Sequence, residues 1–186
     1  MQISKALELL HSKMSSLNLR KHCYSVAAVM RSLAKHFGDD EDKWEIVGLL
    51  HDGDYEFTKD DPKNHAKLMA SWARDLGETD DELLTGIESH GWFHEGKKPK
   101  TKMQWSLFCC DELTGLIVAV TLVRPEKKLS AVTVENVLSK WNSKSFAAGV
   151  DRKQTEMCEE KLGIKLNDFI AIALKAMQNI SKDLGL

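Results

Sequence analysis

Hydrophobic residues recur along almost the whole chain with a period near 3.6, which is the spacing of one buried face of an α-helix. Only three prolines, at positions 62, 99 and 125, interrupt this pattern. The periodicity predicts an all-α fold with little or no strand. The predicted helices cover residues 3–15, 19–37, 40–52, 62–76, 80–90, 103–123, 133–141, 151–162 and 167–184.

One long loop is predicted, at residues 91–102. It contains Gly91, Gly96 and Pro99 together with four lysines, and this composition is typical of an irregular surface segment. Such a loop can line the mouth of a site. Lysines in such a loop are more often solvated on the surface than used to bind phosphate.

Length, composition and charge fit one globular domain over residues 1–186. The 186 residues are 42% hydrophobic and 29% charged, which is enough to bury one core. A net charge of −2 gives no general attraction to a nucleic acid polymer or to anionic lipid. We therefore expect a small-molecule partner, while the oligomeric state is left open.

The cysteines and the apolar segments predict a cytoplasmic protein. Cys23, Cys109, Cys110 and Cys158 lack the C-x-x-C spacing of metal or redox sites, and the chain does not start with a signal-peptide pattern. The longest apolar stretch, residues 113–123, is shorter than the roughly 20 residues of a membrane span. No membrane partner is expected.

Several histidines and carboxylates fall on the predicted buried faces. The periodicity puts each of them in line with apolar residues of its own helix, or at a helix end in the case of the His51-Asp52 pair. This set consists of His22, His51, Asp52, His65, His90 and Asp111. His11 and His36 show no such alignment and are predicted to lie on the surface.

The side chains of this set carry nitrogen or oxygen atoms that can coordinate a metal ion. A single buried histidine is usually a hydrogen-bonded structural residue, but six such groups on inward faces would need many separate partners. Imidazole nitrogens combined with carboxylate oxygens suit Fe, Mn, Zn, Co or Ni, whereas Mg and Ca prefer oxygen ligands alone. The sequence predicts a buried site for a divalent transition metal.

The order and spacing of four of these residues resemble the HD-domain superfamily of metal-dependent phosphohydrolases. The pattern is one histidine, a His-Asp pair and a final aspartate, here His22, His51, Asp52 and Asp111. His51 follows His22 by 29 residues, and Asp111 follows His51 by 60. The resemblance implies an HD core of helices at about 19–124, with additional C-terminal helices at about 125–186.

The extra histidines resemble the binuclear branch of that superfamily. This resemblance implies that Asp52 bridges two metal ions, with His22, His51 and Asp111 on one ion and His65 and His90 on the other. It further implies hydrolysis of a nucleotide or other small phosphoester by metal-activated water. Asp54 or Glu56 is expected to accept the second N–H of an imidazole and fix its orientation.

Further residues are candidates for catalysis or substrate binding. His94 follows His90 by four residues and is a candidate general acid if the helix continues past Gly91. Arg124 is the favoured phosphate contact, ahead of Lys97, Lys98 and Arg152. The sequence is equally consistent with two roles for Trp92 and Phe93, namely packing within the fold and contact with a substrate base.

Two alternative functions share the same ligands. A di-iron HD-domain oxygenase would use this helical scaffold to activate O2, and a nucleotide-binding regulator would retain the metal with little turnover. Neither the substrate nor the metal follows from the sequence, because pocket shape and metal availability decide them.

Overall fold

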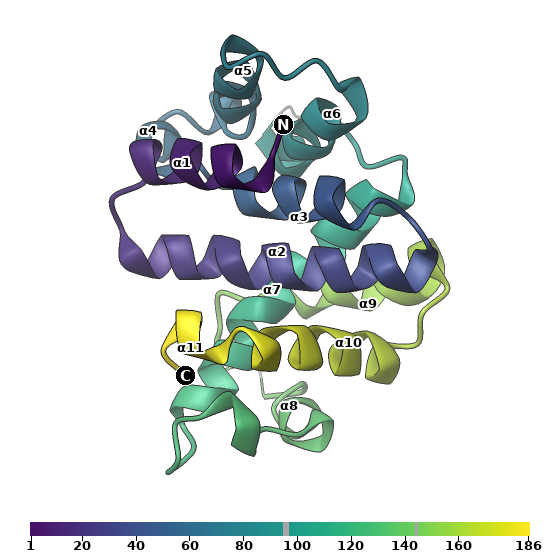
Figure 1. Ribbon diagram of the computed structural model, residues 1–186. Helices are drawn as coiled ribbons and strands as arrows, with labels where there is room; N and C mark the ends of the chain where they lie inside the picture. The colour runs from purple at the N-terminus through teal and green to yellow at the C-terminus, as the bar shows by residue number, and fades with distance from the viewer. Residues whose placement is uncertain (95–96, 144) are drawn as a thin grey trace.

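The computed structural model describes residues 1–94, 97–143 and 145–186, and for residues 93 and 94 it describes the backbone only. Every regular element within these residues is helical (Figure 1). The α-helices are α1 (Ile3–Lys13), α2 (Leu17–Phe37), α3 (Glu41–Leu50), α4 (Tyr55–Thr58), α5 (Lys67–Asp75), α6 (Asp81–Glu88), α7 (Lys102–Leu122), α8 (Val134–Ser139), α9 (Arg152–Leu162), α10 (Leu166–Asn179) and α11 (Ser181–Leu184). Short 3-10 helices are η1 (Pro62–Asn64), η2 (Ser89–His94) and η3 (Leu129–Ala131). The all-α prediction is confirmed.

Helix α2 is the centre of the fold. It packs against α3, α7 and α10, and Figure 1 shows α1 and α3 on one side of it with α10 on the other. Leu33 of α2 and Leu50 of α3 are fully buried in the core. Because α2, α3 and α7 all contact one another, polar residues on their inward faces meet in one place.

Helix α7 is long and apolar enough, by length and composition, to cross a membrane. Most of that apolar window is buried inside the fold, as in the core helix of a globular domain. Its start at Lys102 is fixed by a capping box in which Thr101 and Gln104 bond each other's backbone N–H groups.

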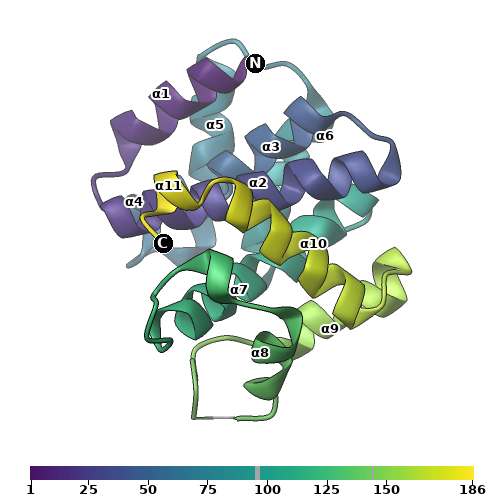
Figure 2. The same ribbon diagram turned by 60° about the horizontal axis from the view of Figure 1, so that its bottom comes forward.

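The C-terminal helices complete the core around α7 and α2. Helix α9 packs against α7 and α10 packs against α2, and Figure 2 shows α8, α9 and α10 on the same side of the molecule. Phe169 and Met177 of α10 are fully buried. The segment that was expected as an extension therefore shares the hydrophobic core of the helices that precede it.

The helix predicted at 62–76 forms only over its C-terminal part, as α5, and its continuity from residue 62 is wrong. The structure has η1, then His65 and Ala66 outside any helix, then α5. Ala66 adopts a left-handed conformation with φ 64°, which costs a non-glycine residue free energy and ends helical geometry. The buried Asp54 carboxylate offsets that cost by accepting the N–H groups of Ala66 and Met69 at the start of α5.

Two smaller expectations also changed, and one short helix was missed. The helix predicted at 167–184 is divided at Ile180 into α10 and α11. The backbone of residues 91–94, expected as loop, continues α6 as the 3-10 helix η2. Helix α4 was not predicted, because four residues are too few for a periodic signal.

Candidate metal centre

Three core helices bring His22, His51 and Asp111 together. His22 lies on α2, His51 caps the C-terminus of α3, and Asp111 lies on α7. His22 Nε2 lies 2.9 Å from Asp111 Oδ1 and 3.2 Å from His51 Nε2. One ligand atom from each residue lies within 4.8 Å of the others. The convergence predicted from the hydrophobic stripes is therefore confirmed.

Asp52 faces two groups of imidazoles with its two oxygens. Asp52 Oδ2 lies 3.6 Å from the Nε2 atoms of both His22 and His51. Asp52 Oδ1 lies 3.2 Å from His65 Nε2 and 3.0 Å from His90 Nε2. The carboxylate thus stands between the two halves of the cluster.

Hydrogen bonds on the outer side of the imidazoles set their tautomers. His51 Nδ1–H donates to the carbonyl oxygen of Gly48 at 2.7 Å, and His65 Nδ1–H donates to Asp54 Oδ1 at 2.9 Å. A neutral histidine that donates from Nδ1 carries its lone pair on Nε2. When the two rings are neutral, as metal ligation requires, both Nε2 atoms therefore present a lone pair to the cluster.

Asp54 anchors the segment that carries His65. Asp54 is fully buried, and it holds the backbone N–H groups of Ala66 and Met69 as well as the His65 ring. Of the two carboxylates expected beside the imidazoles, the structure places Asp54 there. Glu56 points instead to the joint between α1 and α2, where it accepts hydrogen bonds from Ser15 and Ser16.

Two glycines allow the backbone contacts that bring the histidines together. A β-carbon on Gly48 would lie 2.8 Å from Ala27 Cα, so glycine lets α3 lie close against α2. A β-carbon on Gly91 would lie 2.5 Å from the carbonyl oxygen of His65, so glycine lets η2 lie on that backbone. The first contact positions His51, and the second positions His90 beside His65.

The cluster keeps its carboxylates ionised. Burial alone would raise the pKa of Asp52, but His51, His90 and His65 outweigh burial and hold the pKa well below its ordinary value. The pKa of Asp111 is also lowered, because hydrogen bonds from His22 and His51 outweigh its burial.

The imidazoles near Asp52 hold their protons strongly. Burial alone would lower the pKa of His65, but hydrogen bonds to Asp52 and Asp54 raise it to about 9. The pKa of His90 is raised in the same way, since Asp52 and Asp111 outweigh its burial.

The donor set fits a divalent transition metal. Asp111 is buried and Asp52 is partly buried, and within the described part of the chain no lysine or arginine lies at ion-pair distance from either carboxylate, so a bound cation would stabilise both. Two groups of side chains are spaced to hold an ion, namely His22, His51 and Asp111, and His51, Asp52 and His90. Imidazole and carboxylate ligands together suit Fe, Mn, Zn, Co or Ni.

The structure does not bring Arg124 to this cluster. Arg124 follows the C-terminus of α7, thirteen residues beyond Asp111, which is about 20 Å along a helix. Its guanidinium donates to Asn136 Oδ1 at 3.0 Å and lies beside Glu126. Arg152 likewise bonds backbone carbonyls of its own loop, including that of Phe146.

The other candidates near η2 are mostly engaged elsewhere. Lys97 pairs with Glu88 at 2.7 Å, and Lys98 lies over the ring of Trp92. Trp92 itself is half-buried against Trp105 and Phe108, which is a packing role. The side chains of Phe93 and His94, the latter expected as a general acid, lie outside the described residues. His11 and His36 are exposed, as predicted.

Two threonines beside the imidazoles escaped the sequence reasoning. Thr114 lies 3.3 Å from His22 Nδ1 while its hydroxyl donates to the carbonyl of Asp111. Thr58 lies 3.2 Å from His65 Nδ1 and donates to the carbonyl of Asp54. The sequence could have pointed to Thr114, because it shares the inward face of α7 with Asp111. No pattern around Thr58 indicates that it lies beside a histidine.

Comparison with known proteins agrees with this geometry. Residues 19–171 match the HD domain. Ribonuclease Y of Oleidesulfovibrio alaskensis is 31% identical over 100 residues, which are 54% of this chain and 18% of that protein. Ribonuclease Y of Lawsonia intracellularis is 28% identical over 146 residues, which are 76% of this chain and 27% of that protein.

The chain thus spans between about a fifth and about a quarter of the length of the curated relatives that it matches. No solved structure matches the chain. The matched region includes every helix that contributes to the cluster, from His22 on α2 to Asp111 on α7. The chain belongs to the HD domain family.

Proposed function

We propose that this chain is a metal-dependent phosphohydrolase that holds two divalent transition-metal ions. In this proposal His22, His51 and Asp111 bind one ion, His65 and His90 bind the other, and Asp52 bridges them. The observation that carries the proposal is the position of Asp52, whose two oxygens face the two groups of imidazoles.

The chemistry follows from that ligand arrangement. Two bound divalent ions would lower the pKa of water from near 15.7 toward 7 and stabilise the charge that develops on a phosphoryl group. The chain's own contribution is orientation: the Gly48 carbonyl holds the His51 ring, and Asp54 holds the His65 ring. Because His51 is fully buried while the side chain of His22 is partly exposed, substrate and water would enter from the His22 side.

The favoured substrate is a nucleotide or another small phosphoester. The net charge of −2 gives the chain no general attraction to a polyanion. A second candidate is an RNA phosphodiester, and the specific observation that favours it is the name of both relatives, ribonuclease Y. Both candidates require attack of water on phosphorus, so one assay covers them.

The test combines metal analysis with hydrolysis. Protein purified without oxygen is analysed for bound metal and then incubated with nucleotides, simple phosphoesters and a labelled RNA oligonucleotide in 18O-labelled water. We expect two ions per chain, activity that chelators abolish, and one labelled oxygen on the phosphoryl product. The P–O bond to the leaving group breaks, and the departing oxygen takes a proton.

Other results would favour the alternatives. Label in the alcohol fragment would mean cleavage of a different bond. Consumption of O2 with Fe(II) and without phosphate release would identify the oxygenase. Tight nucleotide binding with bound metal but without turnover would identify a regulator.

A further inference from the structure

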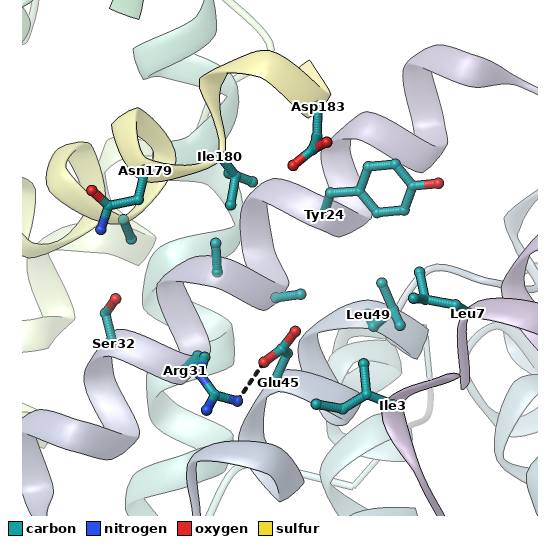
Figure 3. Close-up of a pocket in the computed structure, with 13 residues that line it drawn as sticks. Ile3, Leu7, Tyr24, Arg31, Ser32, Glu45, Leu49, Asn179, Ile180 and Asp183 are labelled. Carbon is teal, nitrogen blue, oxygen red and sulfur yellow. Dashed lines mark hydrogen bonds and ion pairs between the residues drawn. The ribbon is translucent and has the colours of Figure 1, made fainter. Parts of the chain in front are cut away.

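A cavity separate from the candidate metal centre lies between α1, α2, α3 and the segment formed by α10 and α11 (Figure 3). Its volume is about 520 Å³, within the range of about 300–1,000 Å³ that is usual for small-ligand pockets. None of the candidate metal ligands lies in its wall. A molecule bound in this cavity would therefore occupy a second site.

The arrangement of the helices around α2 leaves this space. Helix α1 packs against α3 and α10 packs against α2, and Figures 1 and 2 show α1 and α10 on opposite sides of α2. On α2, Tyr24, Ala28 and Ser32 recur every four residues, so they share the face that borders the cavity. Ala28 lies in the middle of this face, and its short side chain keeps the space open.

Most of the wall is apolar. Helix α1 contributes Ile3 and Leu7, α3 contributes Leu49, and α10 with the residue after it contributes Ala176 and Ile180. A hydrocarbon group placed against these side chains is removed from water, which is favourable in proportion to the apolar area that is covered. The cavity therefore fits a ligand with an apolar body.

The charged groups of the wall favour a cation over an anion. The Arg31 guanidinium is already paired with Glu41 at 3.3 Å, Asp42 at 2.6 Å and Glu45 at 2.7 Å, so it has no unbalanced charge to offer an anion. Asp183 also lines the cavity, and Figure 3 shows it apart from the Arg31–Glu45 pair. Within the described part of the chain, no lysine or arginine lies at ion-pair distance from the Asp183 carboxylate. The wall thus carries uncompensated negative charge.

An aromatic ring adds to the attraction for a cation. Tyr24 lines the cavity, and its hydroxyl is already bonded to His11 Nε2 at 2.6 Å. The ring is left to contact a ligand, and aromatic rings attract organic ammonium ions. A carboxylate, an aromatic ring and an apolar wall together match an ammonium ion that carries a hydrocarbon group.

We propose that this cavity binds a primary amine with an apolar body, in its ammonium form. The ammonium group pairs with Asp183, and the hydrocarbon part lies against the apolar wall beside Ala28. A primary aliphatic amine is protonated near pH 7, as the lysine side chain is. The inference goes beyond the proposed function and does not depend on it, because the two sites share no residue.

The test measures binding to the full chain by NMR of isoleucine and leucine methyl groups, near pH 7 and at low salt. The probes are hexylamine, 2-phenylethylamine and tryptamine, each compared with the alcohol and the carboxylate that have the same hydrocarbon part. A chelator is present throughout, so that no amine binds to a metal ion. Methyl groups of the cavity wall report the location as well as the affinity.

Two substitutions address the space and the charge separately. Ala28→Leu fills the cavity with a residue that favours helices, and Ala28→Ser is its control because it keeps the space. Asp183→Asn removes the charge, and Asp183→Glu retains it. Asp168→Asn is a second control, which makes the same change of charge on α10 outside the wall. Melting temperatures establish that each variant is folded.

We expect at least one amine to shift the methyl resonances of Ile3, Leu49 and Ile180. That amine should bind about 10-fold more tightly than its alcohol, as an ion pair together with an aromatic contact predicts, and the carboxylate should bind more weakly than the alcohol.

The variants should separate the contributions to this binding. Because Asp183 is exposed, Asp183→Asn should weaken amine binding by about 3- to 5-fold and leave alcohol binding unchanged, whereas Asp183→Glu and Asp168→Asn should keep the wild-type affinity. Ala28→Leu should abolish binding of amine and alcohol alike, and Ala28→Ser should retain it.

Several results would overturn the assignment. They are the absence of shifts at the wall with all three amines, an alcohol or carboxylate that binds as tightly as its amine, undiminished binding to Ala28→Leu, and an unchanged amine preference in Asp183→Asn. Since metal content and phosphoester hydrolysis are measured without amines, failure of this inference leaves the proposed function standing, and the reverse also holds.

Discussion

Asp54→Asn is the substitution that most directly tests how the metal centre is held. The amide has the size of the carboxylate but only one accepting oxygen. In the native protein Oδ1 accepts from His65 Nδ1 at 2.9 Å and from Ala66 N–H at 3.1 Å, and Oδ2 accepts from Met69 N–H at 2.9 Å. In the variant an NH2 group must therefore face at least one backbone or ring N–H.

The magnitude follows from these three bonds. A hydrogen bond to a charged group contributes about 1.5–3 kcal/mol, so losing one and weakening the others should lower the free energy of unfolding by about 2–4 kcal/mol. Removing a partner that orients a metal-binding imidazole lowers metal affinity by about 10–100-fold. We also expect the pKa of His65 to fall, because Asp54 contributes to raising it.

Chelator competition measures metal affinity, and denaturant unfolding in the presence of chelator measures stability. Glu56→Gln is the matched control, since Glu56 accepts the N–H groups of Ser15 at 2.8 Å and Ser16 at 2.9 Å, outside the cluster. The control should lose stability but keep its metal affinity. The reasoning fails if Asp54→Asn binds metal as tightly as the wild-type protein, or if both variants lose affinity equally.

Three further predictions follow from the cluster and its surroundings. Elemental analysis should show that Asp52→Ala loses more metal than any other single variant, whereas His65→Ala retains the ion at the core helices; full occupancy in Asp52→Ala would exclude a bridging role. In metal-free protein the pKa of His65 is about 9, so its protonation contributes stability that is complete below the unfolded pKa of about 6.5 and is lost as the pH rises through about 9. The free energy of unfolding should therefore fall across that interval, and a His65→Gln variant with the same pH dependence would contradict this assignment. Gly48→Ala should lower the free energy of unfolding by about 1–3 kcal/mol, because its β-carbon would lie 2.8 Å from Ala27 Cα, and an unchanged melting temperature would show that α2 and α3 separate without cost.

Sequence periodicity was sufficient where ligands lie on long helices. His22 and Asp111 each share a stripe with apolar residues of α2 and α7, so the burial of those stripes also orients the two polar side chains. His51 was recoverable as the end of α3 because a helix end is where adjacent side chains can turn to one site. The positions of these three ligands could be predicted because they follow from the spacing of apolar residues within one helix, which a single sequence shows.

Periodicity was insufficient where tertiary contacts override local preference. His65 was expected on a continuous helix, but the left-handed Ala66 breaks it, and alanine carries no sequence signal for that conformation. The cause is the Asp54 carboxylate, which accepts hydrogen bonds from the His65 ring and from the N–H group of Met69 at the start of α5. Asp54 lies eleven residues before His65. The close approach at Gly91 is likewise a contact with a distant backbone.

The two halves of the cluster are carried by elements of unequal stiffness. His22, His51 and Asp111 project from or cap α-helices that form the core. His65 lies in the turn before α5 and His90 on the short 3-10 helix η2, and these short segments are secured by Asp54 and by the contact at Gly91. A preformed site loses less conformational entropy on binding than a site that must be ordered. If the centre holds the two proposed ions, loading should therefore be ordered in time, with the core position filled first and the other ion exchanging more readily. Mutations of the short segments would then convert the protein into a single-metal form while the fold survives.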